Sequence, residues 1–124
     1  MQFFINKGLK PHQAAGIVGN LMAESNLNPT AINPNSKAYG IAQWLDRKSK
    51  LFKRYGKNPT FEQQLEFVWE ELQGDENRAF KSLLNTSSYS QAVDVIMRQY
   101  ERPSKKEMKE SINRRLKYAK SLLK

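Results

Sequence analysis

Apolar residues recur at helical spacing along most of this chain, and glycines, prolines and capping residues divide them into segments. Residues 2–7 predict a short first helix, which Gly8 can end in a left-handed conformation. Pro11 suits the first turn of a second helix, which must stop near Ser25 because a segment rich in proline and asparagine follows. The apolar face of this second helix consists of Ala14, Ala15, Ile17, Val18, Leu21 and Met22.

The second helix also contains Gly16 and Gly19, each of which weakens a helix by about 1 kcal/mol relative to alanine. Such glycines are tolerated where a central helix packs closely against its neighbours. Beyond this helix, residues 26–36 carry two prolines and four asparagines. We therefore expect residues 28–39 to be irregular or to form a small hairpin.

Helical spacing returns at Leu45 and predicts a helix that Gly56 ends. Thr60 and Gln63 form a capping box for the next helix, which stops at Gly74.

Three more helices are expected toward the C-terminus. Asp75 is placed to cap the first of them and Ser90 the second. Pro103 breaks that second helix, and Ser104 with Glu107 resembles another capping box, which opens the last helix. The chain is thus mostly helical.

Length and composition limit the possible functions. A chain of 124 residues makes one domain, and 39% hydrophobic with 27% charged residues is ordinary for a globular protein. The absence of cysteine excludes a disulfide scaffold and a thiolate metal site, and the single His12 argues against a histidine metal site or a Ser-His-Asp triad. No apolar run is long enough to span a membrane, and the N-terminus lacks the pattern of a signal peptide.

The net charge of +9 favours polyanionic partners such as nucleic acid, anionic lipid or acidic cell-wall polymer. Basic residues concentrate in 47–57 and 102–124, on either side of an acidic segment, 62–76. We expect most of them to be solvated helix faces with a diffuse attraction to anionic surfaces. A nucleic-acid-binding helical domain is an alternative, but no DNA-binding motif is recognisable and the basic residues are split.

Glu24 is the candidate for acid chemistry, at the end of the apolar second helix. Its neighbours Leu21, Met22 and Leu27 are apolar, so desolvation disfavours the anion, and the negative end of the helix dipole acts in the same direction. No lysine or arginine lies within a helical turn of it. These conditions predict a carboxyl that keeps its proton near neutral pH, as a glycosidase acid must, although position alone favours an ordinary surface residue.

The residues after Glu24 strengthen the sugar-cleaving interpretation. Ser25 can hydrogen-bond the carboxyl or the helix end. In the segment from Tyr39 onwards, Gly40 allows close backbone approach, Gln43 offers an amide and Trp44 a flat face for a sugar ring. Trp44 could equally fill the core, whereas a buried amide at Gln43 would need hydrogen-bond partners.

The segments GLKPHQAAGIVGNLMAESNLNP and YGIAQW together resemble the phage tail lysozyme family. The Glu-Ser pair and YGIAQW are also similar to the Glu-Ser…Gly-Leu-Met-Gln pattern of lytic transglycosylases and goose-type lysozymes. The resemblance covers residues 4–51 and extends to QLEFVWEEL and YERP. It implies a lysozyme-like α+β fold, predominantly α, in one domain over residues 1–124, with a central helix presenting Glu24 beside a small irregular or β-hairpin element.

The same resemblance implies the substrate and the site. The substrate would be bacterial peptidoglycan, cleaved without cofactor or metal at the β-1,4 bond between N-acetylmuramic acid and N-acetylglucosamine. By matching positions, Glu24 would be the general acid, and Tyr100 would correspond to the tyrosine that approaches this acid in transglycosylases. Ala42 departs from the methionine usual in transglycosylases. The expected substrate-binding residues are Ser25, Tyr39, Gly40, Gln43, Trp44 and Tyr100.

A resemblance to tail lysozymes also implies a virion-associated protein or one released to the cell wall, either whole or as a domain of a larger tail component. A non-catalytic wall-binding module is an alternative of another class, and anionic wall polymers would suit the basic surface in both cases.

The mechanism depends on a second carboxylate, for which Asp46 and Glu101 are the candidates. Asp46 could instead serve as an N-cap or first-turn residue, and Glu101 could pair with Arg98 or Arg102. If neither reaches the site, Glu24 must protonate the leaving oxygen and then deprotonate water or the muramic 6-hydroxyl. The sequence leaves hydrolysis and lytic transglycosylation both open.

Overall fold

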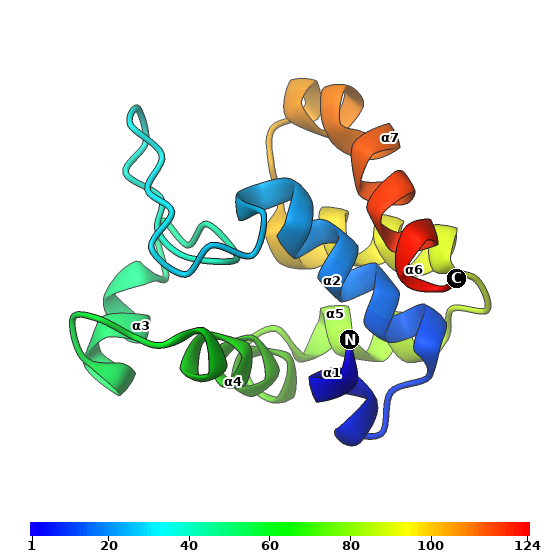
Figure 1. The fold of residues 1–124 in the computed structure, drawn as a ribbon, viewed down its shortest axis with the longest axis horizontal. Coiled ribbons are helices and arrows are strands. Elements are labelled where there is room, and N and C mark those ends of the chain that lie inside the picture. The colour runs from blue at the N-terminus through cyan, green and yellow to red at the C-terminus, as the bar shows by residue number, and fades with distance from the viewer.

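Helix α2, Pro11–Ser25, runs through the middle of the molecule, and the other elements pack around it (Figure 1). The computed structural model describes all residues from 1 to 124. The other elements are α1 (Gln2–Asn6), α3 (Lys48–Tyr55), α4 (Phe61–Gln73), α5 (Asn77–Leu84), α6 (Tyr89–Val95), the π-helix η1 (Ile96–Glu101) and α7 (Lys105–Leu122). None of these helices combines the length and apolar composition needed to cross a membrane.

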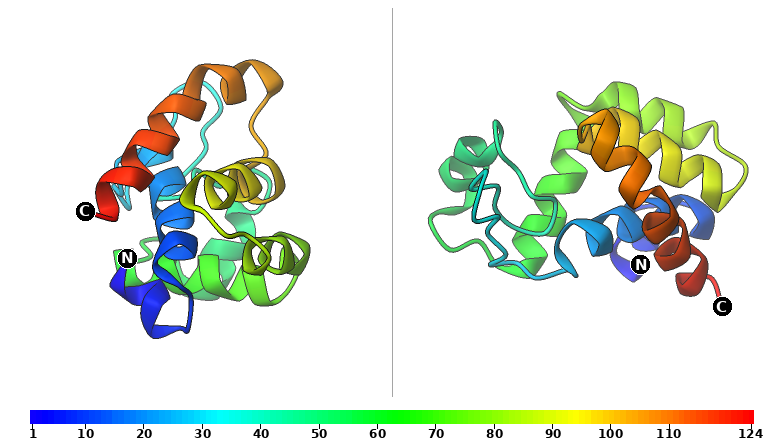
Figure 2. Two further views of the ribbon diagram at one scale, coloured as in Figure 1. Left: turned by 90° about the vertical axis from the view of Figure 1, so that its right-hand side faces the viewer. Right: turned by 90° about the horizontal axis from the view of Figure 1, so that it is seen from above.

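The molecule has two ends joined by α2 and the core. The loop after α2 and helix α3 lie at one end, and α5, α6 and α7 lie at the other (Figure 2). Fully buried side chains from both parts meet in the core, among them Ile17 of α2, Ile41 of the loop, Leu72 of α4 and Ile96 of η1. Burying each of these contributes about 1.5–3 kcal/mol.

Two glycines let α6 and α7 cross directly on α2. A Cβ at Gly16 would lie 2.5 Å from the Cβ of Ala92, and a Cβ at Gly19 would lie 2.9 Å from the backbone nitrogen of Ala119. Only glycine permits so close an approach. The interpretation of Gly16 and Gly19 as close-packing positions of a central helix is confirmed.

The segment between α2 and α3 is irregular and contains no strand. It holds two isolated antiparallel bridges, Ile32 with Tyr39 and Tyr39 with Trp44. Local hydrogen bonds compete with a ladder here: the Asn33 side chain accepts from the backbone N–H groups of Asn35 and Ser36 at 2.8 and 3.1 Å. The predominantly helical part of the α+β prediction is therefore confirmed, and the hairpin is not found.

Gln64 of α4 fixes this loop from beneath. Its buried side chain accepts from the N–H of Ile41 at 2.9 Å and donates to the carbonyls of Pro29 and Pro59 at 2.8 and 3.0 Å. A buried amide with three partners replaces the missing ladder as the support of the segment that borders the cleft.

Most helix boundaries agree with the sequence pattern, and the capping box of Thr60 and Gln63 is confirmed. Two predicted caps are wrong. Asp75 forms an ion pair with Lys50 at 3.0 Å and does not cap α5. Ser88, and not Ser90, accepts the N-cap hydrogen bond of α6, because the helix begins two residues earlier than expected. Similarly, α3 begins at Lys48, three residues after the predicted start.

Candidate active site

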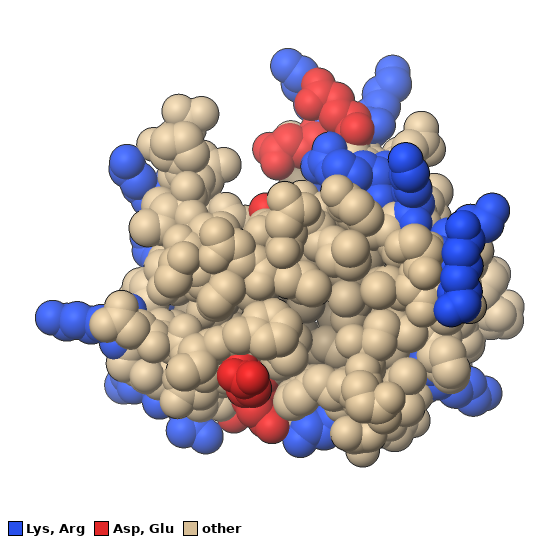
Figure 3. Space-filling model, in the orientation of Figure 1, with Lys and Arg blue, Asp and Glu red and all other residues tan.

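A cleft of about 380 Å³ opens beside the C-terminal end of α2. Its walls are the irregular loop, the end of η1 and the start of α7. Figure 3 shows this hollow as a notch between the projecting loop and the N-terminal end of α7, whose side carries charged residues. Four carboxyl-bearing residues line the cleft: Glu24, Asp46, Glu101 and Glu107.

Glu24 enters the cleft from the last turn of α2, and Arg115 of α7 holds it. The Glu24 side chain is 19% exposed, and Nη2 of Arg115 donates to its Oε1 at 2.6 Å. Arg115 also donates to Asn20 and to Ser111, both at 2.9 Å, so its guanidinium is fixed on three sides. The carboxyl therefore has a defined orientation at the edge of the cleft.

This ion pair corrects two expectations from the sequence. No basic residue lies near Glu24 along α2, but α7 brings Arg115 against it from 91 residues further on. Arg115 is only 3% exposed, and so is not part of a solvated basic face. It is spaced four residues from Ser111 and from Ala119, which are also buried, and this stripe is the sequence signal that could have identified it.

Glu101 also lines the cleft, at the end of η1. Its Oε1 is buried and has no hydrogen-bond partner. Neither arginine expected to neutralise it does so: Arg98 pairs with Asp94 at 2.7 Å, and Arg102 pairs with Glu76.

The surroundings of Glu101 favour its neutral form. Burial, followed by the negative charge of Glu24, raises the pKa of Glu101 well above its ordinary value. Arg115 and Arg47 act in the opposite direction without cancelling this effect. The raised pKa that the sequence pattern predicted for Glu24 is thus found at Glu101, a second carboxyl of the cleft.

Asp46 lies on the loop side of the cleft, exposed, just before α3. The N-cap residue of α3 is Arg47, and no side chain caps this helix. The alternative role of Asp46 as a helix cap is therefore not observed, and its carboxyl remains accessible to solvent in the cleft.

Three of the expected substrate-binding residues support the loop. The Ser25 hydroxyl lies 3.1 Å from the carbonyl oxygen of Leu21 and 2.8 Å from that of Ile41, so it ties the end of α2 to the loop and does not bind Glu24. Tyr39 packs edge-on against Phe52 and does not line the cleft. At Gly40, where φ is +84°, a Cβ would lie 2.6 Å from the side-chain oxygen of Gln64. The group that approaches the Gly40 backbone closely is therefore the side chain of Gln64.

Gln43 and Trp44 also make contacts that hold the loop in place. Gln43 lines the cleft, and its amide nitrogen donates to the carbonyls of Ala31 and Gly40 at 3.1 and 2.9 Å. Trp44 is only 1% exposed, and its indole N–H donates to Glu71 at 2.9 Å. The Trp44 ring therefore lies largely beneath the floor of the cleft, in the role of core residue that the sequence had left open.

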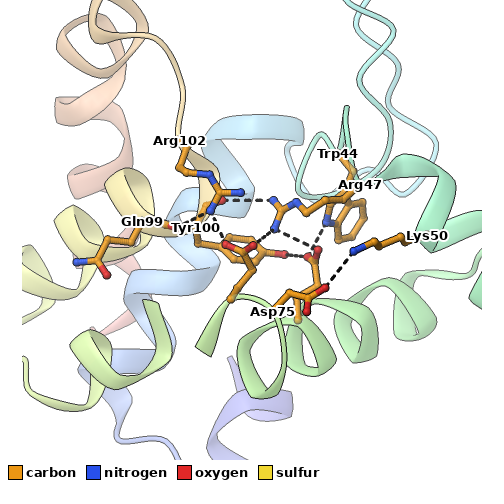
Figure 4. A network of polar contacts seen from close by, with 9 residues as sticks. Trp44, Arg47, Lys50, Asp75, Gln99, Tyr100 and Arg102 are labelled. Carbon is orange, nitrogen blue, oxygen red and sulfur yellow. Dashed lines mark hydrogen bonds and ion pairs between the residues drawn. The ribbon is translucent and has the colours of Figure 1, made fainter. Parts of the chain in front are cut away.

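A buried polar network joins the floor of the cleft to α4 and η1 (Figure 4). Oε1 of Glu71 accepts from Trp44 and, at 2.6 Å, from the hydroxyl of Tyr100. Arg47 lies 3.1 Å from Oε2 of Glu71 and stacks 4.8 Å from the centre of the Tyr100 ring. It also approaches Glu76 at 3.5 Å. Tyr100 is therefore bound to Glu71 and not to Glu24.

Burial raises the pKa of Glu71, which Arg47 and the two hydrogen bonds partly offset. Burial and the charge of Glu71 likewise raise the pKa of Tyr100. Glu71 belongs to the acidic segment 62–76 of the sequence. Its spacing from Val68, three residues earlier on the apolar face of α4, could have identified it as an inward-facing residue.

The fold and the cleft define a class: a predominantly helical protein, consistent with a lysozyme-like fold, whose central helix ends at a cleft lined with carboxyl groups. The family described as phage tail lysozyme matches residues 1–124, and the chain belongs to this family. The resemblance identified from the sequence is thereby confirmed. No curated protein and no solved structure gives a match.

Membership in this family supports a peptidoglycan-degrading enzyme that is phage-associated or acts on the cell wall.

Proposed function

We propose that this protein cleaves the glycan strands of bacterial peptidoglycan at the β-1,4 bond between N-acetylmuramic acid and N-acetylglucosamine, with Glu24 as the general acid. The observation that carries the proposal is the position of Glu24 at the cleft end of the central helix, partly exposed and oriented by Arg115. Family membership supplies the substrate class.

In this mechanism, Glu24 gives its proton to the glycosidic oxygen as the bond to the sugar carbon breaks. The resulting carboxylate stabilises the positive charge that develops on the ring and then accepts a proton from the attacking nucleophile. Water as nucleophile gives hydrolysis, and the muramic 6-hydroxyl gives a 1,6-anhydro product. We favour hydrolysis, because Tyr100, which would correspond to the tyrosine near the acid in transglycosylases, is hydrogen-bonded to Glu71 instead.

Asp46 and Glu101 are the two candidates for a second catalytic carboxyl, and both line the cleft. Asp46 is exposed, so water in the cleft reaches it, and a base at this position would activate that water. The variant Asp46→Asn tests the first candidate: loss of activity with Glu24 intact assigns the base to Asp46, and retained activity leaves Glu24 itself or Glu101 to accept the proton.

The test of the general acid is Glu24→Gln, which keeps the size of the side chain and removes the acid. We expect this variant to lose at least about a hundredfold in the rate of cell-wall clearing, in the range typical of general acid catalysis, while its circular dichroism stays that of the wild type. Glu62→Gln, an exposed glutamate of α4 away from the cleft, is the matched control and should clear walls normally. Unchanged clearing by Glu24→Gln would remove Glu24 from the mechanism.

We further propose that the basic surface draws the enzyme to anionic wall polymers. Exposed lysines and arginines occur along α7, and Figure 3 shows Lys and Arg side chains to the right of the notch, on the side of the molecule where α7 lies. Duplex DNA is the competing polyanion. Salt-sensitive binding to DNA without any effect on cell walls would support a nucleic-acid-binding domain over the enzyme.

A further inference from the structure

We propose that a basic groove between η1 and α7 binds the peptide stem carried by the muramic acid of the substrate, so that the enzyme prefers glycan strands that bear stems. This inference rests on the proposed function, because it names a further part of the same substrate. The groove has a volume of about 340 Å³ and is lined by residues of both helices: Met97, Arg98, Lys105, Met108, Lys109 and Ile112.

The first observation is the chemistry of the groove. Met97 of η1 is 1% exposed and forms its floor, and Met108 and Ile112 of α7 are half-buried along it. Lys105 and Lys109 are exposed, and neither forms an ion pair within the protein. Apolar surface beside two unpaired cations fits a ligand that combines small apolar groups with carboxylates. A peptide stem is such a ligand, because its alanines carry methyl groups and its C-terminus carries a carboxylate.

Arg98 adds a third cation at the η1 side of the groove. Its Nε donates to Asp94 at 2.7 Å, and its Nη1 lies 3.8 Å from the sulfur of Met108. Asp94 is the one carboxylate that pairs with a residue of the groove. The groove therefore keeps a positive charge that attracts an anionic ligand.

The second observation is that the cleft itself does not suit the carboxylates of a stem. Four carboxyl-bearing residues line the cleft, and its two arginines, Arg47 and Arg102, already pair with Glu76. Like charges at short range repel, whereas the unpaired lysines of the groove would gain a partner. The charge distribution therefore directs the stem out of the cleft and toward the groove.

The third observation is that the cleft and the groove lie on different sides of the N-terminal turns of α7. Ser104 and Glu107 line the cleft, and Lys105 and Met108, each the next residue along the helix, line the groove. A helix with its side chains is about 10–12 Å across. An extended peptide of about four residues spans about 13 Å. A stem attached to a muramic acid in the cleft is thus long enough to reach the groove.

The first test compares the cleavage of soluble glycan strands that bear stems with that of the same strands after an amidase has removed the stems. We expect the wild type to favour the stem-bearing strands in kcat/KM by about tenfold, because each of two exposed ion pairs is worth up to about fivefold. The double variant Lys105→Gln, Lys109→Gln should lose most of this preference and keep the wild-type rate on stem-free strands. The double variant Lys117→Gln, Lys120→Gln removes the same charge from exposed positions of α7 outside the groove, and it should keep the preference.

The second test does not require catalysis. Of the four methionines, Met97 and Met108 line the groove, whereas Met1 lines neither the groove nor the cleft. A disaccharide of N-acetylglucosamine and N-acetylmuramic acid that carries a stem should shift the methyl NMR signal of Met108 and leave that of Met1 in place. The same disaccharide without a stem should leave both signals in place.

A Met108 signal that the stem-bearing disaccharide does not move would overturn the proposal. So would an unchanged preference in the groove variant, or an equal loss in both double variants, since the latter result reduces the effect to diffuse attraction. A shift of the Met108 signal by teichoic acid and not by the stem-bearing disaccharide would make the ligand a wall polymer and exclude the stem.

The two tests keep this inference apart from the proposed function. A wild type that cleaves neither kind of strand removes the proposed function, and the methyl signal of Met108 then decides on the groove alone. Cleavage of both kinds of strand at one rate leaves the proposed function intact and removes the role of the groove.

Discussion

At the scale of single residues, the hydrogen-bond acceptors of the buried Arg115 define the geometry of the site. Arg115 donates to Asn20, Ser111 and Glu24 through three different nitrogens. The Asn20 amide donates in turn to the carbonyls of Gly16 and Val93, so the seam between α2, α6 and α7 contains a closed set of polar contacts. Such a set anchors the partly exposed Glu24 side chain to the core at the edge of the cleft.

Replacing Arg115 by methionine should therefore lower the unfolding free energy by more than the loss of a surface contact would. The change leaves the Glu24 carboxylate and the Asn20 carbonyl without their donor, and breaking a buried ion pair in this way costs about 3–5 kcal/mol of unfolding free energy. Urea unfolding of Arg115→Met measures the cost. Arg114→Met, at the exposed neighbouring position, is the control and should change stability by less than about 0.5 kcal/mol. Similar losses in both variants would show that the Arg115 contacts contribute little.

Glu101 should leave a signature in the pH dependence of stability. Its pKa is raised in the folded protein, so the fold binds more protons than the unfolded chain does. Its stabilising contribution is therefore complete below the ordinary value of 4.5 and is lost as the pH rises toward the folded pKa. The slope is at most about 1.4 kcal/mol per pH unit.

Glu101→Gln removes this dependence. The unfolding free energy of the variant minus that of the wild type should therefore increase from about pH 4 to about pH 7. Urea unfolding at both pH values measures the difference, which would stay constant if Glu101 were ionised throughout.

The sequence could predict that Glu24 lies at the end of the second helix, but not what surrounds it. An acid at the end of an apolar helix, followed by a turn and a small-residue segment, is a local pattern that a reader can recognise. The contact with Arg115 joins residues 91 positions apart: the spacing of Ser111, Arg115 and Ala119 could indicate that Arg115 is buried, but not that Glu24 is its partner. The burial of Trp44 and Tyr100 depends on Glu71, whose role as their common acceptor likewise requires the assembled fold.

At the scale of elements, the close crossing of α2 with α7 decides where Arg115 lies. The crossing is possible because Gly19 faces the backbone of α7 at the level of Ala119. Helix propensity alone would favour alanine at this position by about 1 kcal/mol.

Gly19→Ala should nevertheless destabilise the protein. The new Cβ would lie 2.9 Å from the nitrogen of Ala119 and 3.0 Å from the carbonyl oxygen of Arg115, and backbone atoms cannot rotate away as a side chain can. Overpacking of this kind costs about 1–3 kcal/mol, which exceeds the gain in propensity. Thermal unfolding measures the sign, and a stabilised Gly19→Ala would contradict the close crossing.

The π-helix η1 is the element that the sequence pattern did not reveal. The expected helix was to continue to Tyr100, but after Val95 the turns widen, and the N–H of Arg102 bonds to the carbonyl of Met97, five residues earlier. Arg102 then adopts a left-handed conformation with φ of +51°. Apolar spacing over so few residues cannot separate a π-turn from an α-turn, and π-turns are frequent at functional sites. This turn carries both Tyr100 and Glu101.

The sequence predicted where the irregular loop lies, but not the contacts that hold it in shape. Prolines and asparagines between α2 and α3 indicated a break in helix. The support that Gln64 provides from α4 is a long-range contact, and it explains how the segment keeps a defined shape without strands.

At the scale of the whole molecule, the protein carries a net charge of +9, whereas the lining of its cleft includes four acidic residues. The two features have separate tasks in this account. Basic side chains on the surface attract an anionic wall over a distance, and the carboxyls of the cleft act on the glycan bond in contact.

Raising the salt concentration should affect adsorption to the wall and cleavage of the glycan to different extents. Raising the ionic strength from about 0.1 M to about 1 M shortens the Debye length from about 10 Å to about 3 Å, which screens exposed charges much more than the partly buried ion pair of Glu24 and Arg115. Adsorption to intact walls, measured by pelleting, should therefore weaken, while the rate of cleavage of short soluble glycan fragments should change much less. Equal salt effects on both would contradict a separate role for the basic surface.

The most direct test of the central claim is mass spectrometry of the soluble products from purified peptidoglycan. The account predicts that the wild type releases muropeptides with a reducing N-acetylmuramic acid end, and that Glu24→Gln releases none under the same conditions. Glycan strands that remain intact after treatment with the wild-type protein, or identical fragments from Glu24→Gln, would contradict it.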